Sequence, residues 1–286
     1  MQRNSFAAAA GAPADGVAGE AVAATQRKIV LEGVTKSFAG RGRVVEALQP
    51  LDLTVATEEF VALVGPSGCG KSTALNLIAG LISPSQGRVL YDGAPATGTN
   101  YRVGYITQKD TLLPWRTVAA NIGVPLELRC RATARSERND RVAQMIELVG
   151  LKGFEQHYPA ELSGGMRKRV ALARTLIYEP ETLLMDEPFG ALDAQLKLLM
   201  QDELQRLTQL RRMTVVFVTH DLGEAIALAD RVVVFSARPG RIRVIRHIPM
   251  ARPRDVFRAR FSESFGKLHE ELWDELKDEV SKGTDS

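Results

Sequence analysis

The chain lacks the features that mark several common protein classes. It has two cysteines, Cys69 and Cys130, without CxxC spacing, which argues against zinc sites and disulfide frameworks. No apolar run exceeds about five residues, whereas a membrane-spanning helix needs roughly 20. Neither sign of charge dominates, since 37 Lys and Arg face 34 Asp and Glu, so the overall charge does not indicate a nucleic-acid binder. At 286 residues and 45% hydrophobic, the chain can bury a sizeable core.

The N-terminal segment also lacks the pattern of a signal peptide. It is rich in Ala and Gly, contains Pro13, and its most apolar stretch, Phe6–Ala10, is too short for a secretory h-region. We therefore expect residues 1–27 to form a disordered leader and the protein to lie in the cytoplasm.

After the leader the chain alternates between strand and helix patterns. Short β-rich runs, Ile29–Leu31 and Val44–Leu53, precede a continuous apolar strand, Glu59–Val64. A glycine-rich loop follows, and then a helix, Lys71–Leu81, which Gly80 should terminate. Strand, glycine loop and helix in this order predict the phosphate-binding arrangement of a parallel-sheet fold.

A helical pattern interrupts this alternation at about residues 109–178. Within it, apolar residues recur at helical spacing, which predicts an inserted helical subdomain; they are Val142, Met145, Ile146 and Val149. Alternation then resumes, with the predicted strands and helices Leu183–Met185, Leu192–Leu210, Thr214–Val218, Asp221–Ala229 and Arg231–Phe235.

The last segment, residues 251–286, is an amphipathic extension. We expect it to dock on the core or to face a second copy, through an apolar stripe of Phe257, Phe261, Phe265, Leu268, Leu272, Leu276 and Val280. Before it, six arginines between Arg238 and Arg254 are interpreted either as a solvated strand face or as a contact with anionic headgroups or a membrane protein.

The glycine-rich loop matches the pattern GxxxxGK[ST]. Its backbone N–H groups can turn around an anion, and the following helix offers its N-terminus to phosphates. Lys71 can reach the β- and γ-phosphates and the Ser72 hydroxyl can ligate Mg²⁺, while Cys69 fills space. The loop comprises Gly65, Pro66, Ser67, Gly68, Cys69, Gly70, Lys71 and Ser72.

Two carboxylates follow the strand at Leu183–Met185. Ligands of open parallel sheets collect at the carboxyl ends of the strands, where Asp186 and Glu187 stand. Asp186 suits a Mg²⁺ shell, and Glu187 suits the task of holding and polarising an attacking water. A lone Asp-Glu is usually a solvated turn, but the lysine loop favours the metal site.

A third string, Leu162–Met166, resembles the LSGGQ signature of the ABC ATPases. It precedes a predicted helix, Arg167–Tyr178, so Ser163 and the N–H groups of Gly164 and Gly165 can form an anion site at a helix N-terminus. Alone the string could be a simple glycine cap, but it lies between the two phosphate-site motifs. Met166 and Lys168 depart from the Gln that the family commonly has at these positions.

The remaining family motifs occur in order over roughly residues 28–250. Gln108 matches the Q-loop, Asp193 ends a match to the D-loop, and His220 matches the switch histidine. Phe38 matches the aromatic residue that stacks on adenine. The resemblance implies an α/β P-loop NTPase fold, with a RecA-like parallel core, an antiparallel β subdomain and the helical insertion.

The resemblance also implies cofactors and roles. ATP would bind the loop residues above together with Phe38 and Thr73, and Mg²⁺ would bind Ser72, Gln108 and Asp186. Catalysis would depend on Glu187, His220, Lys71 and Gln108. In this family two copies pair head to tail, so ATP held by one chain would also contact Ser163, Gly164, Gly165 and Asp193 of a second.

Further strings resemble the nitrate, sulfonate and taurine importer group, chiefly the LLPWRTV sequence at Leu112–Val118. That group implies two ATPase chains at the cytoplasmic face of a membrane, beneath two membrane-spanning permease chains, with an extracytoplasmic binding protein that delivers a small anionic or polar solute. Leu112–Trp115 is either the floor of a groove for a permease helix or a core patch, and both can hold. The sequence does not name the solute.

Three other kinds of P-loop protein are alternatives to an importer subunit. ABC ATPases that act on DNA or ribosomes usually carry two cassettes, long coiled coils or zinc-ligating cysteines, and this sequence has none of these. A P-loop kinase of small molecules would not need the LSGG string. A cassette that drives non-transport membrane machinery is harder to exclude, and only LLPWRTV argues against it. We expect no nucleic-acid partner.

Overall fold

The computed structural model describes residues 26–40, 43–129, 134–190 and 192–284. The predicted leader and Cys130 lie outside these ranges. The strands are β1 Arg27–Gly40, β2 Arg43–Ala56, β3 Phe60–Val64, β4 Gln86–Tyr91, β5 Ala94–Pro95, β6 Val103–Ile106, β7 Thr182–Asp186, β8 Thr214–Val218, β9 Arg231–Phe235 and β10 Ile242–His247. The helices are α1 Lys71–Ile78, α2 Val118–Arg129, α3 Arg135–Leu148, α4 Gly164–Leu176, α5 Ala194–Leu210, α6 Leu222–Leu228, α7 Val256–Ala259 and α8 Glu263–Thr284, with a 3₁₀ turn at Pro159–Glu161.

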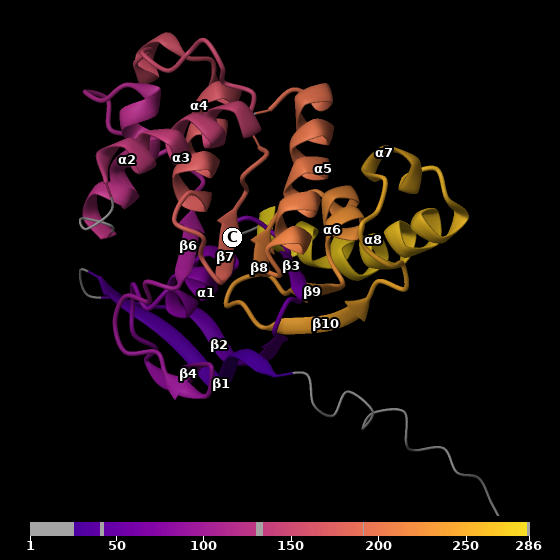
Figure 1. The fold of residues 1–286 in the computed structure, drawn as a ribbon. Coiled ribbons are helices and arrows are strands. Elements are labelled where there is room, and N and C mark those ends of the chain that lie inside the picture. Colours follow the sequence, from indigo (N-terminus) through magenta and orange to yellow (C-terminus); the bar gives the residue numbers. More distant parts are fainter. Residues whose placement is uncertain (1–25, 41–42, 130–133, 191, 285–286) are drawn as a thin grey trace, which may run out of the picture.

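The centre of the molecule is a six-stranded sheet in the order β10-β9-β3-β8-β7-β6 (Figure 1). All neighbouring strands in it are parallel except β9 and β10. Every residue of β3, β7 and β8 is buried, as expected for parallel strands covered on both faces. The predicted α/β fold with a RecA-like parallel core is confirmed.

Alternate side chains of the central strands enter two separate cores. Val61 and Leu63 pack with α1 and the antiparallel sheet β2-β1-β4-β5 on one face. Phe60, Ala62 and Val64 pack with α4, α5, α6 and α8 on the other face. This period-2 division of apolar residues produces three layers, with α1 enclosed between the two sheets.

The helix α1 ends earlier than the sequence pattern predicts, for a local reason. The Leu81 N–H donates to the Asn76 carbonyl at 2.9 Å and the Gly80 N–H donates to the Leu77 carbonyl at 3.1 Å. This is the Schellman arrangement, and it places Gly80 at a φ of +69°. The apolar pattern continues to Leu81, but the helix does not.

The helices α2, α3 and α4 form one group beside β6 and β7 (Figure 1). Met145, Ile146 and Val149 are buried in it, as their spacing predicts. The helix α4 starts at Gly164 rather than Arg167, because the Ser163 hydroxyl accepts the Met166 N–H at 3.2 Å as an N-cap. Both glycines of the LSGG string therefore lie in the first helical turn.

The apolar stripe predicted for the C-terminal segment is wrong for two of its phenylalanines. Phe265, Leu272 and Leu276 are buried, and α8 packs against α6 and β9. Phe257 and Phe261 are exposed, the latter by 77%, and their rings contact each other at 5.2 Å between centroids. The prediction is wrong for these two residues because the segment forms two helices, α7 and α8, so a single helical period does not run through it. The side chain of Val280 is not among those described.

The arginine-rich stretch is divided between solvent and the interior. Arg238, Arg241 and Arg243 are exposed, as expected for a solvated strand face, whereas the other three arginines are partly or fully buried. Arg243 pairs with Glu279 of α8 at 2.5 Å, and Arg252 pairs with Asp230 at 2.7 Å. Arg254 is buried, and its guanidinium donates to main-chain carbonyls at the end of α6. These arginines tie the C-terminal segment to the sheet. Among the described residues, no helix is both long enough and apolar enough to cross a bilayer.

Candidate nucleotide site

The predicted phosphate-site motifs meet in a cavity of 390 Å³ at the carboxyl ends of β3, β7 and β8. Ligands of open parallel sheets collect at this edge. Residues from widely separated segments line the cavity: Phe38, Ala47, Ser67, Gly68, Gly70, Lys71, Ser72, Thr73, Gln108, Asp186, Glu187, Val218 and Arg238. The tertiary structure therefore brings together the glycine loop, the Q-loop residue and both carboxylates.

Gly70 is the position in the loop that most clearly requires glycine. Its φ is +101°, and a Cβ there would lie 2.6 Å from the Leu48 Cδ2 atom and 2.9 Å from the Ala47 carbonyl oxygen. The helix α1 begins at the next residue, so the loop encloses a helix N-terminus, which favours an anion.

Lys71 is buried, and its ammonium forms hydrogen bonds within the glycine loop. It donates to the carbonyl oxygens of Gly65 at 2.8 Å and Pro66 at 2.7 Å. Gly65, Pro66 and Cys69 are absent from the cavity lining, and the Cys69 side chain is buried as a space-filling residue would be. Burial raises the pKa of the Cys69 thiol, so it is held as a neutral group.

Asp186 ends β7 with only 8% of its surface exposed. Burial raises the pKa of its carboxyl, while a hydrogen bond with Ser72 and the nearby Lys71 charge oppose that rise. Hydroxyl, carboxylate and amide oxygens are hard donors that suit Mg²⁺. The buried negative charge of Asp186 beside the Ser72 hydroxyl fits a divalent cation.

Glu187 is the meeting point of three predicted residues. The Gln108 amide donates to its Oε2 atom at 3.1 Å, and the His220 Nδ1 atom lies 3.6 Å from the same oxygen. Its main chain has a φ of +47°, a left-handed conformation that costs a non-glycine residue of order 1–3 kcal/mol. A hydrogen bond from its N–H to the Val218 carbonyl at 3.0 Å holds this conformation.

An ionic cluster around the buried Glu224 lies next to His220 in the chain and was not predicted from the sequence. Lys197 of α5 pairs with Asp221 at 2.9 Å and with Glu224 at 2.5 Å. Thr219 donates to Glu224 at 2.5 Å. Burial raises the pKa of Glu224, and its hydrogen bonds from Lys197 and Thr219 oppose that effect. The cluster links the helix after Asp193 to the residue after His220.

Arg238 is a further residue of the cavity that was not predicted from the sequence, because it was grouped with the other arginines. Arg238 follows β9, which pairs with β3, and so arrives beside the glycine loop. The sequence signal that could have found it is its position directly after a predicted strand.

The LSGG string and Asp193 are not in this cavity. Ser163 is exposed at the start of α4, and a Cβ on Gly165 would lie 2.8 Å from the Leu196 Cδ2 atom. Asp193 is exposed at the start of α5 and accepts the Leu196 N–H at 2.9 Å. Within one chain, these helix N-termini belong to a second surface.

Comparison with known proteins places these features in a family. Residues 48–190 match the family model described as "ABC transporter". The chain is 48% identical to an uncharacterised ABC transporter ATP-binding protein of Methanocaldococcus jannaschii, over 89% of this chain and 93% of that protein. It is 43% identical to the aliphatic sulfonates import ATP-binding protein SsuB of Bacillus subtilis, over 77% and 84% respectively.

A solved structure agrees in fold. The ATP-binding cassette MJ0796, in a dimeric post-hydrolysis state bound to ADP and phosphate, superposes with a TM-score of 0.72 at 31% identity. The superposition covers 78% of this chain and all of the other chain.

Proposed function

This chain belongs to the ABC transporter family of ATPases, and we propose that it is the subunit that hydrolyses ATP to energise an importer. The observation that carries this proposal is the convergence of Gln108 and His220 on one carboxylate oxygen of Glu187, at the rim of the glycine loop. Such a group can orient a water molecule against a phosphate bound by the loop.

The roles of the site residues follow from their positions. The loop N–H groups and the N-terminus of α1 bind phosphate oxygens, and Lys71 moves its ammonium from loop carbonyls to the phosphates. Phe38, half-exposed at the cavity rim, stacks on adenine. Ser72, Asp186 and Gln108 would hold Mg²⁺, which supplies charge neutralisation at the phosphates. Glu187 orients the water, and His220 holds that carboxylate and reaches the phosphate.

The proposal includes a second copy of the chain. Ser163, Gly164, Gly165 and Asp193 lie at helix N-termini outside the chain's own cavity, where anions bind favourably. Ser163 and Asp193 are exposed there. In a head-to-tail pair they would cover the nucleotide held by the other copy. The dimeric state of the similar cassette MJ0796 supports this arrangement.

Two permease chains and a position on the cytoplasmic face of a membrane complete the proposed importer. Trp115 is 71% exposed, although it directly follows the segment in which Leu112 packs on the core. An exposed tryptophan beside the Q-loop suits an anchor for a permease helix. The name of the SsuB relative supports a small anionic solute such as a sulfonate.

Turnover of ATP by the purified chain tests the ATPase proposal directly. We expect phosphate release that requires Mg²⁺ and that is abolished in Lys71→Ala. Co-expression with permease and binding-protein chains tests the importer, since solute uptake in vesicles should then depend on ATP. Release that is independent of Lys71 would contradict the ATPase, and uptake without ATP would contradict the importer.

A further inference from the structure

Lys168 is a buried cation that crosses from α4 to the segment carrying Gln108. Only 9% of its surface is exposed. Its ammonium donates to the carbonyl oxygen of Gln108 and lies 3.5 Å from that of Thr107. A buried lysine is costly unless its charge is satisfied, and these carbonyl oxygens supply part of that compensation.

No carboxylate is paired with this ammonium in the part of the chain that the structure describes, although several are near. Asp110, Asp186 and Glu187 all raise the pKa of Lys168, while burial, the largest effect, lowers it. Reciprocally, the Lys168 charge lowers the pKa of Asp186. Lys168 also lines a small cavity together with Met185, the residue before Asp186. Its ammonium therefore lies near the predicted metal site, while carbonyl oxygens hold it in place.

The same segment is also held by other basic residues of α4. Arg167 pairs with Asp110 at 2.8 Å, and Arg174 donates to the Thr111 carbonyl at 3.0 Å. Lys168 differs from them because it contacts Gln108 itself, whose amide meets Glu187. A shift of α4 would therefore be passed through one side chain to the hydrolytic carboxylate.

We propose that Lys168 is a positioning residue with two separable effects: its N–H donors fix the main chain of Gln108, and its charge weakens Mg²⁺ binding at Asp186. This inference rests on the proposed ATPase function. It makes the helix that starts with the LSGG string a control element for the chain's own metal site, besides its proposed role toward a second copy.

Three substitutions separate the two effects. Lys168→Gln keeps an N–H donor but removes the charge, Lys168→Met removes both, and Lys168→Arg keeps both. Arg169→Gln is the matched control, because Arg169 lies on the same helix but donates to the Val149 and Gly150 carbonyls instead. All variants are made in the full-length chain.

The first readout is binding of fluorescent N-methylanthraniloyl-ATP at rising Mg²⁺ concentration. Removal of a nearby positive charge strengthens the field that attracts a cation, so the half-saturating Mg²⁺ concentration should fall about three- to tenfold in both Lys168→Gln and Lys168→Met. Lys168→Arg and Arg169→Gln should match the parent. General damage to the site would move the value in the opposite direction.

The second readout needs neither metal nor nucleotide. Hydrogen exchange of the amides of residues 107–111 should become faster in Lys168→Met and stay near the parent in Lys168→Gln. ATP turnover should follow the same order, falling about tenfold or more in Lys168→Met only.

Unchanged or weaker Mg²⁺ binding in the two neutral variants would overturn the charge effect, and unchanged exchange in Lys168→Met would overturn the positioning effect. Both results leave the ATPase proposal intact if the parent still binds nucleotide and hydrolyses it. A parent chain that fails to bind nucleotide overturns the ATPase proposal and this inference together.

Discussion

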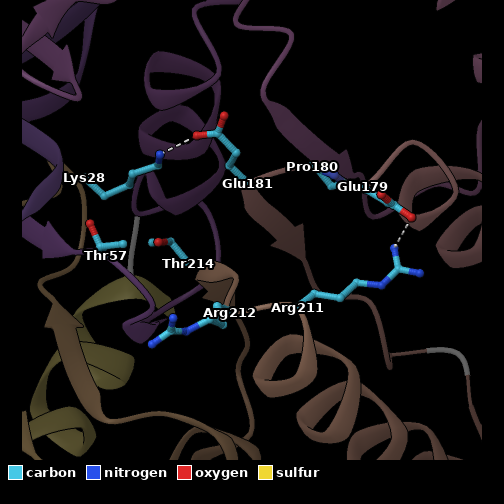
Figure 2. A pocket seen from close by; sticks show the side chains of 8 residues that line it. All are labelled: Lys28, Thr57, Glu179, Pro180, Glu181, Arg211, Arg212 and Thr214. Carbon is cyan, nitrogen blue, oxygen red and sulfur yellow. Dashed lines mark hydrogen bonds and ion pairs between the residues drawn. The ribbon is translucent and has the colours of Figure 1, made fainter. Parts of the chain in front are cut away.

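The two edges of the parallel sheet each carry a polar cavity, and only one of them has the properties of a reactive site. The cavity at the amino edge is the larger, at 480 Å³ against 390 Å³. It is lined by Lys28, Thr57, Glu179, Pro180, Glu181, Arg211, Arg212 and Thr214 (Figure 2). A larger volume and a lining rich in charged residues therefore do not identify the reactive site.

The difference lies in how far the charged groups are already satisfied. At the amino edge, Lys28 pairs with Glu181 at 2.5 Å, and Arg211 reaches Glu179 at 3.6 Å (Figure 2). At the carboxyl edge, burial raises the pKa of Asp186, and the main chain of Glu187 is held in a strained conformation. A ligand would satisfy the second cavity and would have to break existing ion pairs in the first.

The largest expected effect is that of Glu187→Gln at the carboxyl edge. We expect ATP binding to persist while hydrolysis falls by about 10²–10⁴-fold, because the water loses the carboxylate that orients it. ATP-bound dimers should accumulate. Phosphate release and analytical size exclusion with ATP measure both effects, and near-normal turnover would remove Glu187 from the catalytic role.

A large effect is also expected when the two surfaces of one chain are disabled in different copies. Chains with Ser163→Arg and chains with Lys71→Ala should each be inactive, and their mixture should regain part of the turnover, since one site of each mixed pair is intact. The control is a mixture of chains that all carry both changes. Turnover no higher than this control would contradict a site shared between copies.

A smaller effect is expected for Trp115→Ala, which tests a surface outside both cavities. Co-purification with the permease chains should weaken by more than about 1 kcal/mol, the level that separates anchors from neutral contacts. Because Trp115 is exposed, the Tm and turnover of the isolated chain should stay the same. Leu112→Ala, whose side chain packs on the core, should instead lower the Tm. A Trp115→Ala chain that melts early would refute the anchor.

The smallest effect is expected for Arg212→Gln at the amino edge. Arg212 is 77% exposed and pairs with Glu58 at 3.2 Å on the surface, so its loss should lower the free energy of unfolding by less than about 1 kcal/mol. ATP turnover should stay within twofold of the parent. Urea unfolding and phosphate release provide the test, and a larger fall in turnover would show that the amino edge takes part in function.

The local sequence pattern was sufficient to predict strands in which nearly every residue is buried. The predicted strands Thr214–Val218 and Arg231–Phe235 coincide with β8 and β9. A short apolar run between turn residues is typical of a buried strand in an α/β domain. The glycine loop was also readable, since its residue types are demanded by backbone geometry. Phe257 and Phe261 could not be placed in this way, because a helical period carries no information about where one helix ends and another begins.

The sequence by itself determined the chemistry: a phosphate loop, two carboxylates at a strand end, a helix N-terminus rich in glycine, and an order of motifs typical of one family. Only the tertiary structure decided which charges are neutralised and which remain available. It tied Arg243 to α8, brought Arg238 to the cavity, left Trp115 on the surface, and aimed Lys168 at Gln108. The physical reason is the separation along the sequence of the residues involved. Loop geometry depends on neighbouring residues, whereas ion pairing and burial depend on side chains brought together from distant parts of the chain.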